Sequence, residues 1–395
     1  MTMRVRASLM LMAALAMLGL AGCDHYVCGN GNPILSGSCT ASGTGIGGGG
    51  TNTGLTAFEY VYGGTGEIQG IALDGLNVAD SGTFAPIPTF VSPTFPEQYE
   101  ASAMVTVDKQ FLYMPLSNDT ILGFSIDSSS GALTPLSTSP FPVTAPYSMA
   151  VDPTGRFLFV GGSAGISVFT VNATTGELTE TSGSPFSTGG EFVFQMATDG
   201  KGRYLYAVQG AGGGNLLEFS YDQTTGALTS LGTLSSKVSE IAGESSGQYI
   251  LGITQEAGNL DGPTDPHIYV FGISATGTIT ELAASPFPTT NDPVNIAVSP
   301  NGAFVYAFTA SPFESGTATE PVEGYQLSAL PSALTPLSTS PFTSLLTEIG
   351  MFDQSGQYLF VGGTAYAANT TTGALTSSLP GYGFGETIWA VTDAP

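Results

Sequence analysis

The sequence predicts an all-β chain folded as a seven-bladed β-propeller of four-stranded antiparallel blades, closed by the C-terminal strand joining the N-terminal blade. The first observation is a phrase, Gly-x-Leu-Thr, that recurs at intervals of roughly 40 to 55 residues, a period typical of repeat architectures. Its copies begin at Gly131, Gly176, Gly226, Gly277 and Gly373, and one copy begins at Ser332. The second observation is the abundance of Thr, Ser, Val, Tyr and Phe, without a long helical segment after the first 22 residues.

One complete repeat can be followed over residues 146–186. Residues 146–151 alternate as a strand, and Asp152-Pro153-Thr154-Gly155 supplies the Pro and Gly of a tight turn. Three further strands are expected at 156–160, 165–171 and 178–186. Four antiparallel strands in about 45 residues make one propeller blade.

The first strand and its turn recur, which sets the number of blades. Copies lie at 195–202, 240–247, 295–302 and 349–356, with a looser copy at 99–108, so six complete blades are expected from about 98 to 381. Residues 58–90 then offer three strands, and 385–393 offer one. Joining them would make a seventh blade and remove the exposed sheet edges of an open array. An open β-solenoid or a sandwich is the alternative.

The charge of the chain excludes one class of partner. The formal net charge is -24, which repels phosphate backbones, so nucleic-acid binding is rejected. We interpret the acidity as solubility outside the cytoplasm. Calcium binding is the alternative, but no Asp-x-Asp-x-Asp-Gly loop occurs. Two histidines in the whole chain argue against a multi-histidine metal site, and no cofactor is expected.

The N-terminus has the features of a targeting segment. Arg4 and Arg6 precede an apolar run, Leu9 to Leu20, that is too short to span a bilayer. The run ends in Leu20-Ala21-Gly22-Cys23, which resembles the bacterial lipobox. The resemblance implies a lipoprotein signal peptide over 1–22, a lipid chain such as palmitate on Cys23, and membrane anchoring in the bacterial envelope, facing the periplasm or the exterior. An ordinary secretory signal is the alternative.

A tether is expected between this anchor and the propeller. Residues 23–56 hold the lipidated Cys and a Gly/Ser/Thr-rich stretch typical of a flexible linker, and the propeller would occupy 57–395. Cys28 and Cys39 are candidates for a disulfide in an oxidising compartment, or for two free thiols.

The turns of the repeat carry a family resemblance. The inner turn reads Val151-Asp152-Pro153-Thr154-Gly155 in one blade and Val298-Ser299-Pro300-Asn301-Gly302 in another, and the outer turn reads Thr-Gly-x-Leu-Thr. Over about 58–393 the chain resembles the bacterial lactonase-type seven-bladed propellers, which include 6-phosphogluconolactonase and muconate-cyclising enzymes. The resemblance implies His, Arg and Glu side chains around the central channel.

This chain departs from the family at those channel positions. We call the family's histidine position, found by alignment on the turn glycine, the slot. Here the slot residues are Ser148, Gln195, Glu240, Asn295 and Ile349, with Met104 and Ile388 in the looser copies. The neighbouring arginine position reads Tyr147, Phe194, Ser239, Val294 and Glu348. Neither position holds a His or an Arg.

Lactone hydrolysis needs a base and a group that stabilises the oxyanion. Glu240 and Glu348 could form a carboxylate pair, but nothing supplies the electrophilic partner. We expect Arg156, Arg203 and His267, the only His of the mature domain, to be solvated turn or loop residues. No catalytic residue is therefore assigned.

Three functions remain open. The preferred one is a lipid-anchored, non-catalytic module that binds a small molecule, glycan or envelope protein through its channel face. Its candidate ligand-binding residues are Tyr147, Ser148, Gln195, Glu240, Asn295 and Glu348. The alternatives are a lactone or sugar-acid lactone hydrolase and a structural scaffold of the envelope.

Overall fold

The computed structural model describes residues 27–28, 32–33, 57–63, 67–73, 84–86, 105–210, 214–254, 265–309, 321–328, 334–343, 350–361, 364–376 and 388–393. All regular structure in these residues is β-strand, so the all-β prediction is confirmed. No helix in this described part is long and apolar enough to cross a membrane.

The chain separates into two compact units, Met1–Thr51 and Asn52–Pro395. In the first unit, β1 (Val27–Cys28) pairs antiparallel with β2 (Asn32–Pro33), and Cys28 lies opposite Asn32. Cys23, Cys39 and the expected tether at 40–56 lie outside the described residues. Lipidation of Cys23 and the disulfide therefore stay predictions.

Six blades of the second unit are each built from consecutive strands. Blades 1 to 3 comprise β6 (Val105–Val107), β7 (Phe111–Leu116), β8 (Thr120–Ile126), β9 (Leu133–Pro135) and β10 (Phe141–Pro142); β11 (Pro146–Val151), β12 (Phe157–Gly162), β13 (Gly165–Val171) and β14 (Leu178–Glu180); and β15 (Val193–Thr198), β16 (Tyr204–Gln209), β17 (Asn215–Tyr221) and β18 (Leu228–Ser235).

Blades 4 to 6 continue the series. They comprise β19 (Glu240–Gly243), β20 (Tyr249–Ile253), β21 (His267–Ile273), β22 (Ile279–Glu281) and β23 (Phe287–Pro288); β24 (Pro293–Val298), β25 (Phe304–Thr309), β26 (Pro321–Leu327), β27 (Leu334–Pro336) and β28 (Phe342–Thr343); and β29 (Gly350–Phe352), β30 (Tyr358–Val361), β31 (Thr364–Ala368) and β32 (Leu375–Thr376).

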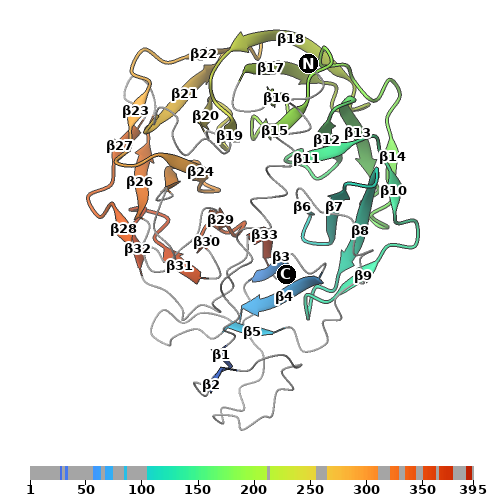
Figure 1. The fold of residues 1–395 in the computed structure, drawn as a ribbon, viewed down its shortest axis with the longest axis horizontal. Helices are drawn as coiled ribbons and strands as arrows, with labels where there is room; N and C mark the ends of the chain where they lie inside the picture. The colour runs from blue at the N-terminus through green and yellow to red at the C-terminus, as the bar shows by residue number, and fades with distance from the viewer. Residues whose placement is uncertain are drawn as a thin grey trace. The chain divides into compact units, whose positions relative to one another are not determined.

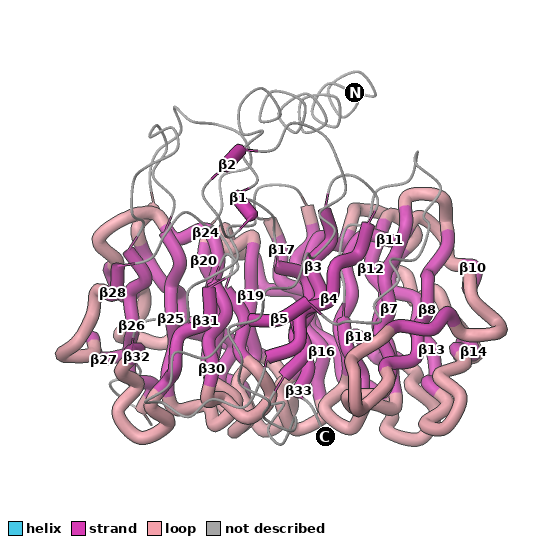
Figure 2. The backbone as a smooth tube through the Cα atoms, turned by 90° about the horizontal axis from the view of Figure 1, so that it is seen from below, coloured by secondary structure: helices cyan, strands magenta, loops and turns pink. Residues whose placement is uncertain are grey.

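The blades follow one another around a common centre. In Figure 1 the first strand of each blade, such as β11, β15 or β24, is innermost, and β14, β18 and β22 lie at the outside. Figure 2 shows the blades from the side, with their turns at the two ends of the strands. A propeller of four-stranded antiparallel blades is thus confirmed, with six blades made of consecutive strands.

One further sheet combines the two ends of the second unit. Its strand order is β33 (Ile388–Asp393), β3 (Ala57–Gly63), β4 (Glu67–Leu73) and β5 (Phe84–Pro86). β33 pairs antiparallel with β3, so that Asp393 lies opposite Ala57. β33 also contacts β29 of blade 6 and β6 of blade 1.

A buried acceptor organises the turn after most inner strands. The Asp152 carboxylate accepts the N–H of Phe157 at 2.6 Å and that of Thr154 at 3.1 Å. Residues that accept the N–H five positions later in the same way are Asp199, Glu244, Ser299 and Asp353. Because these acceptors are buried and bonded, each turn is fixed without an unsatisfied backbone donor.

A second repeated element was not recognised in the sequence. Ser-Pro-Phe recurs at the outer edge of four blades, beginning at Ser139, Ser184, Ser285 and Ser340. Each serine hydroxyl accepts a backbone N–H from the third strand of its own blade, from Gly123, Val168, Val270 and Gly324 respectively. These bonds fasten the returning outer segment to the blade.

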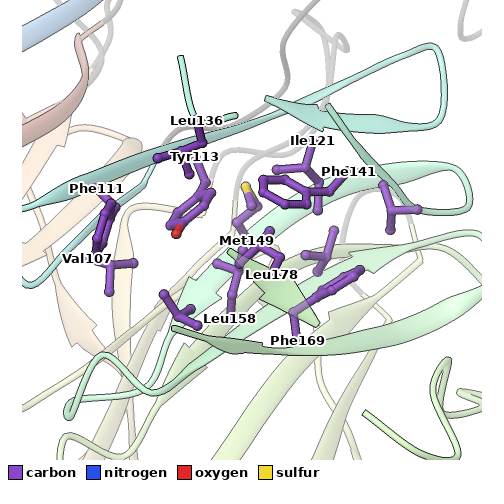
Figure 3. Close-up of a cluster of buried hydrophobic side chains, with 13 residues drawn as sticks. Val107, Phe111, Tyr113, Ile121, Leu136, Phe141, Met149, Leu158, Phe169 and Leu178 are labelled. Carbon is purple, nitrogen blue, oxygen red and sulfur yellow. The ribbon is translucent and has the colours of Figure 1, made fainter. Parts of the chain in front are cut away.

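The hydrophobic core lies between blades. Figure 3 shows the cluster between blades 1 and 2, in which Phe111 and Tyr113 of β7 face Met149, Leu158 and Leu178 of blade 2. Corresponding clusters join blades 2 and 3, 3 and 4, 4 and 5, and 5 and 6. Blades 2 to 5 therefore each bury both faces against their neighbours, as stacked repeats must.

The glycine of Gly-x-Leu-Thr belongs to this packing. Gly176 has a φ of 69°, and a Cβ there would lie 2.5 Å from Cδ1 of Phe111 in the preceding blade. Tyr113 of that blade donates its hydroxyl to the Gly176 carbonyl at 2.6 Å. The same bond joins Tyr206 to Gly277 at 2.8 Å and Tyr306 to Gly373 at 2.7 Å. The glycine thus admits an aromatic ring of the preceding blade.

This hydrogen bond predicts a specific loss of stability. Tyr206 is fully buried, and its replacement in Tyr206→Phe leaves the buried Gly277 carbonyl without its donor. The free energy of unfolding, measured by urea titration, should fall by about 1–3 kcal/mol. Tyr204→Phe is the control, because the Tyr204 hydroxyl bonds to Ala275 O in an exposed position. Equal losses in both variants would contradict this assignment.

Candidate functional site

The slot residues occupy equivalent positions on their strands. Ser148, Gln195, Glu240 and Asn295 lie on β11, β15, β19 and β24, at the end where each inner strand begins, opposite Gly161, Val208, Ile253 and Phe308 of the next strand. The alignment on the turn glycine therefore placed them in one register. Glu348 and Ile349 lie outside the described residues.

Three of these side chains accept a backbone N–H of the next blade. Gln195 Oε1 accepts the N–H of Ile241, Glu240 Oε1 accepts the N–H of Ile296 at 3.2 Å, and Asn295 Oδ1 accepts the N–H of Gly350 at 3.1 Å. Each acceptor thus reaches the residue that follows the slot of the next blade. We call this series the slot ladder.

The remaining slot contacts also join blades. Asn295 donates Nδ2–H to Glu240 Oε1 at 2.6 Å, and Ser148 donates its hydroxyl to Val193 O at 3.2 Å. Ser148 is 6% exposed, so its side chain offers little surface to a ligand. Hydrogen bonds between blades therefore occupy the positions where the family resemblance implies histidine.

Glu240 has the most perturbed electrostatics of the slot ladder. Burial raises the pKa of its carboxyl group to about 8, although hydrogen bonds from Ile296 and Asn295 favour the ionised form. The group therefore holds a proton over much of the neutral range. Oε1 of Glu240 already accepts two hydrogen bonds. This structural role in the slot ladder accounts for the position of Glu240 without a catalytic role.

The neighbouring positions differ from the slots in backbone geometry. Tyr147, Phe194 and Val294 are the extra residues of β-bulges, which interrupt the pairing of β11, β15 and β24 with the next strand. A bulge re-aims a side chain out of the regular ladder, and bulges are common next to functional sites. Two of these three residues are aromatic.

The expectation that Arg156 and Arg203 are solvated turn residues was incomplete. Arg156 donates to the carbonyls of Gln223 at 2.7 Å and Thr224 at 3.0 Å, in the outer turn of blade 3. Arg203 binds Asp199 at 2.7 Å and donates to Gly247 O of blade 4 at 2.9 Å. Both side chains join blades through turn carbonyls, which their five-donor geometry favours.

The expectation for His267 as an isolated loop histidine also changes. Its Nδ1 lies 2.7 Å from Asp265 Oδ1, while Lys237 Nζ lies 2.8 Å from Asp265 Oδ2. Tyr269 donates its hydroxyl to the same Oδ2 at 2.8 Å. We call Lys237, Asp265, His267 and Tyr269 the blade 4 cluster. Lys237 lies just before β19 and Asp265 just before β21, whereas His267 and Tyr269 lie on β21. The cluster is therefore at the same end of the inner strands as the slots.

Charge pairing sets the ionisation of this cluster. Burial alone would raise the pKa of Asp265, but hydrogen bonds from Lys237, Tyr269 and His267 lower it overall. The bond to Asp265 raises the pKa of Lys237. The carboxylate is thus ionised and can only accept, so His267 presents Nδ1–H to it. The unprotonated nitrogen of the neutral ring is then Nε2.

A second carboxyl group supports the cluster from blade 5. Asp292, which directly precedes β24, accepts the backbone N–H of Asp265, and burial raises the pKa of its carboxyl group. Its Oδ1 is buried without a hydrogen-bond partner among the described residues. Sequence reasoning missed the cluster because it occurs in one blade, so no repeat indicates it. The local phrase Asp265-Pro266-His267 was the available signal.

The described ranges also bear on two other kinds of site. No group of three or more His, Cys, Asp or Glu side chains in them could hold a metal ion. A shallow polar depression is lined by Asn301, Ser355, Gln357, Ala368, Asn369, Thr370 and Thr371. Asn301 lies in the turn after β24, whereas the slot residue Asn295 lies near its start. The depression is therefore at the opposite end of the inner strand from the blade 4 cluster.

Part of the chain is similar to a known protein family. Residues 67–196 match a family model described as Lactonase, 7-bladed beta-propeller. The chain resembles the lactonase-type propellers. No curated protein sequence matches it.

Solved structures with a similar fold agree with this resemblance. A putative 6-phosphogluconolactonase from Bacteroides fragilis has a TM-score of 0.62 at 15% identity, covering 88% of this chain and 99% of its own. One from Bacteroides uniformis has a TM-score of 0.61 at 16% identity, covering 86% and 99%. The periplasmic gluconolactonase of Pseudomonas aeruginosa has a TM-score of 0.62 at 14% identity, covering 86% and 99%. At these identities the likeness shows the lactonase-type fold alone.

The raised pKa of Glu240 predicts a pH dependence of stability. Between its ordinary value of 4.5 and the folded value of about 8, the folded chain holds a proton that the unfolded chain has released. The free energy of unfolding should therefore fall as pH rises through this range, by up to about 1.4 kcal/mol per pH unit. Glu240→Gln keeps the acceptor for Ile296 but cannot ionise, so this part of the slope should disappear.

The measurement is denaturant unfolding at several pH values between 5 and 8. Glu177→Gln is the matched control, because Glu177 is exposed on the outer turn of blade 2. It should leave the slope of the wild-type protein unchanged. If Glu240→Gln kept the full slope, the Glu240 carboxyl group would not carry the proton.

Proposed function

We propose that this protein hydrolyses a neutral lactone, with His267 as the general base. The single observation that carries the proposal is the pairing of His267 and Lys237 with the two oxygens of one carboxylate, Asp265. The matched family model and the lactonase names of the similar structures support a hydrolase over the non-catalytic binding module preferred from the sequence. The order of preference is therefore reversed.

The cluster supplies the groups that lactone hydrolysis needs. His267 Nε2 takes a proton from water as the water oxygen forms a bond to the lactone carbonyl carbon. The carbonyl oxygen becomes an oxyanion, and the Lys237 ammonium is the positive charge available to stabilise it. When the oxyanion collapses, the ring carbon–oxygen bond breaks, and the ring oxygen leaves with the proton from His267. The product is the open hydroxy acid, and His267 is neutral again.

Asp265 and Tyr269 position these two reactive groups. The bond from His267 Nδ1 to Asp265 fixes the ring and its tautomer, as the carboxylate does in histidine-dependent hydrolases. The Tyr269 hydroxyl holds the other carboxylate oxygen together with Lys237. His267 is 34% exposed along its side chain and Asp265 is 17% exposed, so solvent reaches the histidine while its partner is shielded.

The charge of the site favours a neutral lactone over a phosphorylated one. The chain has a net charge of -24, and Lys237 is accompanied by Asp265 and Asp292. A phosphate would meet net negative charge here, because recognition of phosphate normally relies on clustered Arg or Lys donors. An unphosphorylated sugar lactone meets no such repulsion.

We also propose that the six blades and the terminal sheet form a closed seven-bladed ring. The antiparallel pairing of β33 with β3, and the contacts of β33 with β29 and β6, support this closure. In such a ring both ends of the domain meet in one blade. No sheet edge at the seam is then left exposed for association with another chain.

The catalytic assignment predicts the effect of His267→Ala. Loss of the general base should lower kcat/KM for D-glucono-1,5-lactone by about a hundredfold or more, measured by acid release and corrected for spontaneous hydrolysis. Glu240→Gln should remain within about threefold of the wild-type protein. A wild-type protein without activity, or a loss with Glu240→Gln and not with His267→Ala, would refute the assignment.

Closure predicts that removal of β33 weakens the whole domain. A chain truncated after residue 387 lacks the partner of β3, and the seam between blades 1 and 6 is opened. Thermal unfolding should begin at least about 10 °C lower and lose cooperativity, because a loss of several kcal/mol moves Tm by several degrees or more. A chain that ends at Asp393 is the control. An unchanged single transition in the shorter chain would argue against closure.

A further inference from the structure

Three aromatic rings meet near the beginning of the inner strands of blades 2 and 3. Tyr147 of β11 contacts Phe192 and Phe194 of blade 3, with ring centroids 5.1 and 5.4 Å apart and interplanar angles of 77° and 76°. Phe192 and Phe194 are 4.9 Å apart at 43°. All three side chains are partly exposed, although most large aromatic residues of the core are buried. We call these three residues the aromatic platform.

The backbone beneath the platform is fixed from both sides. Tyr147 and Phe194 are the extra residues of the bulges in β11 and β15, directly before the slot residues Ser148 and Gln195. Ser148 bonds to Val193, between the two phenylalanines, and Gln195 accepts the N–H of Ile241 in blade 4. These bonds fix the backbone that carries the rings before any ligand arrives, which reduces the entropy lost on binding.

The spacing of the rings decides between two kinds of ligand. Neighbouring rings whose centroids are about 5 Å apart touch one another, so no space for a cation remains between them. A quaternary ammonium cage needs rings that stand apart around the charge. The platform instead offers partly exposed aromatic surface, and the negative potential of a ring face attracts the positive C–H groups of a flat, neutral ring.

The surroundings are also those of an uncharged ligand. The cation–π contacts of Arg156, Arg203 and Lys237 are made to Phe157, Tyr204 and Tyr269. Burial raises the pKa of the Tyr147 hydroxyl, which keeps the phenol neutral at physiological pH. Tyr147 and Phe194 thus stand at the position where the family resemblance implies arginine, and they provide an apolar ring in place of a charge.

We propose that Tyr147, Phe192 and Phe194 form a stacking subsite for the C–H face of a neutral sugar ring. This inference rests on the proposed function, because the ring is that of the lactone substrate. The platform, on blades 2 and 3, and the cluster, on the adjoining blade 4, lie at the same end of the inner strands. Aromatic walls with few polar groups are typical of small-molecule sites.

The test separates binding from turnover. D-Glucono-1,5-lactam is a neutral ring that resists hydrolysis, so its dissociation constant can be measured by calorimetry on the full chain. Phe194→Leu retains an apolar side chain but removes the ring, and should weaken lactam binding at least about fivefold. Val294→Leu changes the corresponding bulge residue of blade 5 and should leave the dissociation constant within about twofold.

A second variant tests the platform without removing a ring. The chain has a single tryptophan, Trp389, so Phe194→Trp adds one fluorophore at the platform itself. Its emission should shift on adding the lactam, with a dissociation constant close to that of the wild-type protein. Choline should produce no shift.

The outcomes distinguish the platform from the catalytic proposal. Wild-type protein that does not bind the lactam, Phe194→Leu with wild-type affinity, or emission that responds to choline instead would each overturn the platform. Lactam binding that depends on Phe194, in a protein whose hydrolysis is unaffected by His267→Ala, would support the platform and refute the catalytic assignment. Hydrolysis that requires His267, together with lactam binding that is unaffected by Phe194→Leu, would support the catalytic assignment and refute the platform.

Discussion

The structure depends on the contact between one blade's outer turn and the aromatic residues of the blade before it. A single four-stranded sheet leaves both faces uncovered, so every blade needs its neighbours to bury them. At Gly176 the left-handed backbone and the missing Cβ let Phe111 approach, while Tyr113 satisfies the carbonyl. Any side chain at this position would separate the blades. The repeat is therefore preserved in the sequence as a packing constraint between blades.

The inner strands of neighbouring blades are joined in a comparable way by polar groups. Gln195, Glu240 and Asn295 each satisfy a backbone N–H of the next blade, so the inner strands are connected side by side around part of the ring. A histidine or an arginine at these positions would have to replace that hydrogen bond. The departure from the histidine and arginine that the family resemblance implies thus has a structural consequence, because the slot residues connect the blades. The groups that we propose for hydrolysis lie in the blade 4 cluster instead.

Much of this could be predicted from the sequence, because the repeat is periodic. The repeat period predicted the blades. Alignment on the turn glycine predicted one register for Ser148, Gln195, Glu240 and Asn295, as the strand pairing shows. The partners of those side chains could not be predicted, since alignment does not say which N–H of the next blade a side chain reaches. The blade 4 cluster lacks a counterpart in other blades, and Lys237 is distant in sequence from Asp265, so periodicity gave no indication of it.

The central claim is that the slot side chains connect the blades. Amide hydrogen exchange at Ile241, compared between the wild-type protein and Gln195→Ala, tests it directly. The variant removes the only acceptor that the slot ladder provides for that N–H. We predict that Ile241 exchanges at least about tenfold faster in the variant, while Ile296, which bonds to Glu240, stays protected. Unchanged exchange at Ile241 would contradict the claim.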